Sequence, residues 1–376
     1  MLELLPLLTW PGENIFSDNP TLYFLLFYAP FILFILYGQK FQTWMVLNEI
    51  GRSLNKLKMM KDKSRKEAID YFANVCKTSS DPTERIDQFL EYFTILPVDT
   101  DPSGIMKKIE HIITLRDDRL RSEVRKMITI TDPVKMSAAE NILEATTALN
   151  YIYKIVRHYY LLGKRTMSLY VLIQLQMVMP IILQEADALM KAIDAFKLAQ
   201  PIGDGIGAMV AGKLMINCEK KIIGKDTVMS ESEFNGRSLY LIKAEGPAGN
   251  VGQIGTVVEK LIEEMGLKPN AIVMIDAALK LEGEKTGDIA EGIGAAIGGI
   301  GVDRFKIEEV ATKHRIPLYA IVIKESIIDA ITVMRREIAE ATDKVIGIIK
   351  RILDEKTSVG DKVFIIGVGN TLGIGQ

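Results

Sequence analysis

The 376-residue sequence has little cysteine and histidine, and no excess of charge of either sign. Its two cysteines, Cys76 and Cys218, form no CxxC pair, which excludes a disulfide framework and favours a reducing compartment. The three histidines share no zinc-like spacing and no HExxH motif occurs, which argues against a classical zinc hydrolase. A net charge of −2, from 46 basic and 48 acidic residues, gives no electrostatic basis for binding nucleic acid.

What the sequence does contain is a long uncharged stretch near its N-terminus. Residues 19–39 carry no charged side chain, and the apolar body at 22–37 suits a helix that spans a bilayer core about 30 Å thick. The first 18 residues contain no Lys or Arg, and no small-residue cleavage site follows, which disfavours a cleaved signal peptide. We expect an extracytoplasmic N-terminus at 1–19 and a transmembrane helix at 20–39. A buried helix of a soluble protein is the alternative.

Basic residues follow this stretch and predict its orientation. Between positions 40 and 66 there are eight lysines and arginines but only two acidic residues. Because basic segments stay on the cytoplasmic side, the sequence predicts a single-pass protein of the cell membrane, with its N-terminus outside and its C-terminal domain in the cytoplasm. A second uncharged stretch, at 166–184, is expected to be a buried or interface helix. If it were a second span, the C-terminal half would lie outside.

The rest of the chain divides into a helical region at 40–200 and an α/β domain at 201–376. In the first, apolar residues recur at three- and four-residue spacing, which predicts helices throughout. A Ser-Ala-Ala-Glu segment at 137–140 fits a capping box, and Asp132-Pro133 fits a loop or a helix start.

After residue 201, short β-rich runs alternate with helical runs and glycine-rich turns. The expected strands are 238–244, 271–275, 318–323 and 362–367, and the expected helices include 256–264 and 327–352. This alternation predicts a three-layer α/β domain with a mainly parallel sheet. The last strand is apolar without alternation, so we expect it in the interior of the sheet.

Two acidic residues are the candidate functional groups. Asp276 follows the apolar run at 271–275, so it is expected at the carboxyl edge of the sheet, where open α/β sheets bind ligands. Asp204 lies between two glycines just before an amphipathic run, where the helix dipole favours a carboxylate. Capping of that helix would explain Asp204 equally well. The glycine-rich turns fit no nucleotide-binding fingerprint.

These residues also carry a resemblance to known peptidases. Ile275-Asp276-Ala277 and the segment Ile316-Pro317-Leu-Tyr-Ala-Ile321 resemble motifs of the bacterial spore germination proteases, which share a fold with the hydrogenase maturation peptidases. In that family the aspartate of the first motif is catalytic. Asp204-Gly-Ile-Gly207 is similar to the family's second acidic motif, and Gly367-Val-Gly-Asn370 to the strand end before it. Their order is reversed here, which implies a circularly permuted domain.

The resemblance implies a membrane-anchored peptidase-like protein that cleaves a protein substrate with Asp204 and Asp276. Asn250, Arg304 and Asn370 are then the candidate substrate-binding residues. No cofactor is expected, although the two aspartates could instead hold a divalent metal. The whole arrangement also resembles an uncharacterised archaeal family of membrane-anchored proteins, which implies no activity. A non-catalytic scaffold that assembles protein partners at the membrane is the alternative function, and the oligomeric state is left open.

Overall fold

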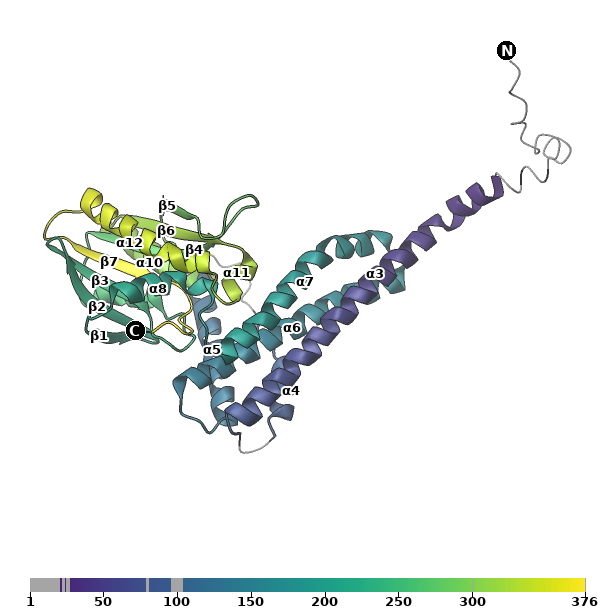
Figure 1. Ribbon diagram of the computed structural model, residues 1–376, viewed down its shortest axis with the longest axis horizontal. Helices are drawn as coiled ribbons and strands as arrows, with labels where there is room; N and C mark the ends of the chain where they lie inside the picture. Colours follow the sequence, from purple (N-terminus) through teal and green to yellow (C-terminus); the bar gives the residue numbers. More distant parts are fainter. Residues whose placement is uncertain are drawn as a thin grey trace, which may run out of the picture. The chain divides into compact units, whose positions relative to one another are not determined.

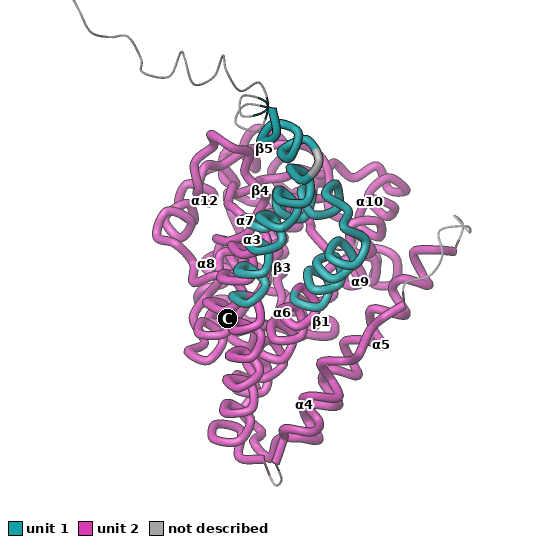
Figure 2. The backbone as a smooth tube through the Cα atoms, turned by 90° about the vertical axis from the view of Figure 1, so that its right-hand side faces the viewer, with its two compact units in different colours: residues 1–56, 153–181 teal, residues 57–152, 182–376 magenta. Residues whose placement is uncertain are grey.

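A computed structural model describes residues 21, 24, 28–78, 81–95, 104–299 and 301–375. The chain forms two compact units (Figure 2): unit 1 comprises residues 1–56 and 153–181, and unit 2 comprises residues 57–152 and 182–376. The predicted combination of a helical N-terminal half and an α/β C-terminal half is confirmed (Figure 1).

The described part of the N-terminal half is helical. Its elements are α3 (Ala29–Asp70), η2 (Tyr71–Val75), α4 (Thr83–Leu90), α5 (Ile105–Met127), α6 (Pro133–Thr166) and α7 (Leu169–Lys197). Helix α6 begins directly after Asp132, whose Oδ1 accepts the N–H of Val134 at 2.9 Å and so caps the helix. The capping box predicted at 137–140 is therefore wrong. Ser137 lies inside the helix, and its Oγ accepts the N–H of Gly249 at 2.7 Å.

Helix α7 is, within the described residues, the one helix that is long and apolar enough to cross a membrane by length and composition. It contains most of the uncharged stretch at 166–184, for which the sequence predicts a buried or interface helix. Only 22% of its most apolar window is buried. Tyr170, Met177 and Ile181 are largely exposed, so this stretch is not a buried core helix.

The transmembrane helix predicted at 20–39 lies partly outside the described residues, and the N-terminal segment predicted at 1–19 lies wholly outside them. From Ala29 onward the chain is a continuous helix of 42 residues that runs on into charged sequence. Its first turns expose large apolar side chains, among them Phe34 and Ile35. The N-terminal span therefore stays a prediction.

The C-terminal half contains one seven-stranded sheet in the order β1-β2-β3-β7-β4-β6-β5. The strands are β1 (Lys220–Gly224), β2 (Thr227–Phe234), β3 (Arg237–Ala244), β4 (Ala271–Leu279), β5 (Ile289–Ile293), β6 (Leu318–Glu325) and β7 (Lys362–Gly367). The four central strands are parallel, and antiparallel strands lie at both edges. The sheet is thus mixed, with a parallel centre.

All four expected strands are confirmed, as β3, β4, β6 and β7. Strand β7 lies between β3 and β4, which confirms the interior position predicted from its apolar sequence. The sequence prediction does not include the edge strands β1 and β5, or β2 beside β1. Asn235 and Gly236, which join β2 to β3, both have positive φ, and an Asn-Gly pair of this kind is a strong sequence signal for the hairpin that these strands form.

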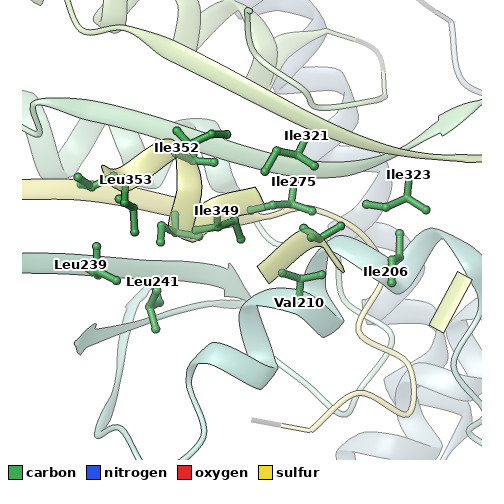
Figure 3. Packing of buried hydrophobic residues seen from close by; sticks show 14 of the residues in the cluster. Ile206, Val210, Leu239, Leu241, Ile275, Ile321, Ile323, Ile349, Ile352 and Leu353 are labelled. Atoms are coloured by element: carbon green, nitrogen blue, oxygen red, sulfur yellow. The ribbon is translucent and has the colours of Figure 1, made fainter. Parts of the chain in front are cut away.

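Helices cover both faces of the sheet (Figure 1). The elements on one face are α8 (Ile206–Leu214) and α12 (Arg336–Lys356), and those on the other are α9 (Ile254–Glu259), η4 (Lys260–Glu264) and α10 (Val302–His314). Figure 3 shows the hydrophobic core between the sheet and the face covered by α8 and α12. There Ile206 and Val210 of α8 and Ile349 of α12 pack with Ile275 of β4. Alternate strand residues face opposite sides, so Asp276, next to Ile275, faces the side of α9 and α10.

The single helix predicted at 327–352 is wrong in its first third. A short helix, α11 (Ile327–Ile331), ends early, and α12 begins only at Arg336. Between them Val333 forms an isolated antiparallel bridge with Ile202. This bridge leads the chain into the turn that carries Asp204.

Candidate functional site

Asp276 lies one residue beyond the point where β7 stops pairing with β4. Strand β4 continues past Asp276, so the expectation that the strand ends before it is wrong, but the pairing with β7 ends at Ile275 and Gly367. The side chain is 6% exposed. Its Oδ1 accepts the N–H of Ala277 at 2.8 Å, and its Oδ2 accepts the N–H of Gly298 at 3.0 Å. Asp276 therefore lies at the carboxyl edge of the sheet, just past the end of β7, and two backbone N–H groups hold its carboxyl group in place.

Asp204 lies in a 3₁₀ turn, η3 (Gly203–Gly205), directly before α8. The preceding Ile202 fixes one side of the turn through its bridge to Val333. On the other side, the N–H of Asn370 donates to Asp204 Oδ2 at 2.9 Å. The first residue before α8 is Gly205, and no side chain caps that helix. Helix capping therefore does not account for Asp204.

Glycines let the end of β7 and the start of α8 touch backbone to backbone. A Cβ on Gly207 would lie 2.3 Å from the carbonyl oxygens of both Ile275 and Val368. A Cβ on Gly369, whose φ is +128°, would lie 1.9 Å from the carbonyl oxygen of Asp204. The segment around Asp204 and the segment after β7, more than 150 positions apart in the chain, are thus in direct backbone contact at the site.

Replacing Gly207 with alanine is expected to destabilise unit 2 by about 1–3 kcal/mol or more, because the methyl group must displace two strand backbones. The matched control is Gly347→Ala in α12, where an added Cβ meets no atom within 4 Å. That change is expected to stabilise the helix by roughly 0.5–1 kcal/mol. Urea unfolding of both variants measures the difference, and equal midpoints would contradict the packing described.

Both aspartates line the same cavity, which has a volume of about 380 Å³. This volume lies within the range of roughly 300–1,000 Å³ typical of small-molecule sites. The carboxyl edge of the sheet and the turns before α9 and α10 form most of the wall. Helix α5 supplies the remainder through Glu110, Ile113, Thr114, Arg116 and Asp117. Glu110 also accepts a bond from Lys306 of α10 at 2.6 Å, which fastens α5 beside the cavity.

Burial raises the pKa of both carboxyl groups. It raises the pKa of Asp276 to about 7, with a further contribution from the negative charge of Asp204, while the N–H groups of Ala277 and Gly298 oppose the rise. Burial also raises the pKa of Asp204, against the N–H of Asn370. Near pH 6 the pair therefore keeps a proton that two exposed aspartates would have lost.

The three candidate substrate-binding residues are not among the residues that line the cavity. Arg304 is exposed and pairs with Glu308 at 2.9 Å. The amide of Asn250 donates to the carbonyl of Glu245, and the Oδ1 of Asn370 accepts the N–H of Leu372. The side chains of both asparagines thus hold loops, and Asn370 serves the site through its backbone N–H.

A third buried acid near the pair was not singled out from the sequence. Glu325, the last residue of β6, is 1% exposed. Burial raises its pKa to about 8, and the charge of Asp204 is the next largest cause. The signal was available, because an acidic residue at the end of an apolar strand is the pattern that pointed to Asp276.

No group of three or more His, Cys, Asp or Glu side chains that could hold a metal ion occurs in the described part of the chain. Asp204 and Asp276 would therefore have to bind a divalent ion without a third such protein ligand. Hard divalent cations usually take six or more oxygen ligands, several of which can be water. Metal binding stays an alternative to the direct use of the two carboxyl groups.

Fold and site together define an α/β protein with a paired-acid cavity at the carboxyl edge of its sheet. Two family models match the chain: "Protein of unknown function (DUF1512) N-terminal domain" over residues 24–199 and "Domain of unknown function (DUF1512) C-terminal" over residues 202–375. The chain therefore belongs to the DUF1512 family. A search of the curated proteins finds no match. Helix α5 lies in the first matched region and the two aspartates lie in the second, so both family regions contribute residues to the cavity wall.

Proposed function

We propose that this protein is a membrane-anchored peptidase in which Asp204 and Asp276 act as a pair. The observation that carries the proposal is that both carboxyl groups line one cavity while the charge of one raises the pKa of the other. No local sequence feature links the two residues, so turn chemistry does not explain their meeting. A cavity of about 380 Å³ leaves room for a water molecule and part of a peptide.

The negative charge of Asp204 raises the pKa of Asp276, so we assign the shared proton to Asp276 and the carboxylate to Asp204. Asp204, as the carboxylate, accepts a proton from a water molecule while the oxygen of that water bonds to the peptide carbonyl carbon. Asp276 donates its proton to the carbonyl oxygen, which gives a tetrahedral intermediate. The C–N bond then breaks, the amine takes the proton from Asp204, and a hydroxyl proton of the intermediate returns to Asp276. The products are a carboxylic acid and an amine, and both aspartates regain their starting states.

The resemblance to the spore germination proteases supports this proposal. The permutation requires the last strand to lie beside the first helix of the domain. Consistent with this, the N–H of Asn370, three residues after β7, donates to Asp204, in the turn just before α8, at 2.9 Å. The family's second acidic motif and the strand end before it would thus meet in space, although they lie at opposite ends of this domain's sequence. The resemblance to archaeal membrane-anchored proteins supports the proposed order of an N-terminal anchor, a helical region and an α/β domain.

The direct test is a mass-spectrometric comparison of protein N-termini in cells with and without this protein. A peptidase is expected to create at least one new N-terminus in a cytoplasmic protein, and that N-terminus should disappear with the protein. Identical sets of N-termini in both cell lines would contradict the proposal.

The scaffold is the second candidate function, and exposed apolar side chains on α6 and α7 favour it. Tyr159, Tyr170 and Met177, all in unit 1, are each more than 45% exposed, and large exposed apolar side chains of this kind can pack against a partner. A scaffold should retain its function when Asp276 is replaced by asparagine, whereas a peptidase should lose it.

We further propose that the chain spans the membrane once, at 20–39, with its C-terminal domain in the cytoplasm. The basic excess at 40–66 supports this orientation. Within unit 1, Gln176 of α7 donates to Glu49 of α3, so the uncharged part of α7 packs beside α3 about ten residues after the proposed span. A helix in that position would not cross the same bilayer.

Cysteine labelling tests this orientation, because Cys218 is partly exposed in the α/β domain and Cys76 is buried. A membrane-impermeant maleimide is expected to label Cys218 in inverted vesicles and not in right-side-out vesicles. Cys218→Ser should abolish the label and serves as the control. Labelling of Cys218 in intact right-side-out vesicles would mean that the domain lies outside.

A further inference from the structure

Glu325 is a buried acid to which the proposed reaction gives no role. Its backbone pairs with Leu279 of β4, and its side chain is 1% exposed. Neither carboxyl oxygen has a hydrogen-bond partner among the described residues. Because a buried polar group without a partner costs free energy, an ionised Glu325 would be strongly disfavoured here.

The side chain lies directly against the turn that carries Asp204. A Cβ on Gly203 would come within 2.5 Å of Glu325 Oε2, so glycine at this position leaves the space that the carboxyl group occupies. Glu325 is not among the residues that line the cavity. It therefore approaches the acid pair from within the fold, where it does not compete with a substrate.

The charged groups that act on Glu325 are all acidic: Asp204 first, then Asp329 and Asp276. The negative charge of Asp329 is stabilised by Arg335 and by the hydrogen bonds of the α11 cap. Asp276 accepts two backbone N–H groups and Asp204 accepts one. Glu325 has no such donor, so among these four acids it is the one whose ionised form is stabilised least.

We propose that Glu325 is the third member of the site: it stays protonated beside Asp204 and so keeps the cluster of Asp204, Asp276 and Glu325 at a single negative charge during the reaction. Its place in catalysis rests on the proposed function, whereas its protonation and its coupling to Asp204 do not. Glu325 is thus a positioning residue, because it acts on the reaction through the ionisation of Asp204. Its own atoms need not touch the substrate.

Infrared spectroscopy of the full chain in detergent micelles tests this directly. Glutamate labelled with ¹³C at the side-chain carboxyl separates protonated Glu from protonated Asp in the spectrum. At pH 6.5 the wild-type protein is expected to show one protonated glutamate that is missing in Glu325→Gln. In Asp204→Asn, the pH at which that glutamate ionises should fall by about one unit or more, because the main repelling charge is gone.

Two results would overturn the proposal: identical spectra of the wild-type protein and Glu325→Gln at pH 6.5, or an unchanged midpoint in Asp204→Asn. Glu325→Met, which has a similar volume and no ionisable group, replaces Glu325→Gln if the latter does not fold. Neither spectrum depends on turnover, so a failure of the peptidase proposal would be seen separately, as unchanged protein N-termini.

The pH dependence of cleavage provides the functional readout. In the wild-type protein, loss of one proton from the cluster hinders loss of the second, so activity should decline over a broad range on the alkaline side. Glu325→Gln and Glu325→Met are both expected to narrow that decline, because one titrating group is gone. A purely structural role for Glu325 would leave the shape of the pH profile unchanged and would contradict the proposal.

Discussion

Replacing either Asp204 or Asp276 with asparagine is expected to reduce peptide cleavage by about 10²-fold or more, the usual contribution of a positioned acid or base. Asparagine keeps the size of the side chain but can neither accept the proton from water nor donate one to the carbonyl oxygen. The double variant should be no worse than the worse single variant, because the two residues act as a unit. The readout is the amount of each protein N-terminus that depends on the wild-type protein.

The matched control for this prediction is Asp343→Asn on α12. Asp343 is an exposed aspartate that pairs with Lys213, and it is not among the residues that line the cavity. Cleavage by this variant should equal that of the wild-type protein. If Asp276→Asn also retained full cleavage while folding normally, the paired-acid mechanism would be wrong.

Asp276→Asn is also expected to be less stable than the wild-type protein at acidic pH and as stable or more stable at alkaline pH. The folded-state pKa of Asp276, about 7, is above the ordinary value of 3.8, so the native state holds this proton more tightly than the unfolded state does. The wild-type protein therefore loses stability as pH rises from about 4 to about 7. The difference between 3.8 in the unfolded state and about 7 in the folded state corresponds to a loss on the order of 4 kcal/mol.

The asparagine variant lacks this pH-dependent loss but has a constant cost. Its side chain has one oxygen and can accept only one of the two N–H groups, from Ala277 and Gly298, that the two oxygens of the Asp276 carboxyl group accept, which costs about 1–3 kcal/mol. We expect it to be less stable than the wild-type protein at pH 5 and as stable or more stable at pH 8. Urea unfolding at both values measures this, and a constant difference would contradict the buried, protonated state of Asp276.

The central strands of the sheet were predictable because each is an apolar run bounded by turn residues. Strand β7 shows this most clearly, since the predicted bounds 362–367 agree with the observed ones. The strands outside the parallel centre are not uninterrupted apolar runs: in β2, the residues from Ser230 to Glu233 are all polar, and burial alternates only from Glu231 onward. Their signal lay in the turn at Asn235 and Gly236 rather than in hydrophobicity.

The two aspartates could be selected from the sequence because Asp276 follows an apolar run typical of a buried strand and Asp204 lies between two glycines before an amphipathic run. The rest of the cavity could not. Arg116 and Asp117 of α5 look like an ordinary solvated helix face, and their place in the cavity wall depends on how that helix docks in unit 2. Arg304, a candidate substrate-binding residue, lies within α10, where the spacing of four residues places it beside Glu308.

The central claim is that Asp204 and Asp276 are close enough to share one proton. A double-mutant cycle of unfolding free energies at pH 8, with Asp204→Asn, Asp276→Asn and the double variant, tests it most directly. Each single change removes the same repulsion, so the account predicts that the double variant gains clearly less than the sum of the two single effects, and that this coupling shrinks at pH 5. Free energies that simply add at pH 8 would show that the two carboxyl groups do not interact, and would contradict the account.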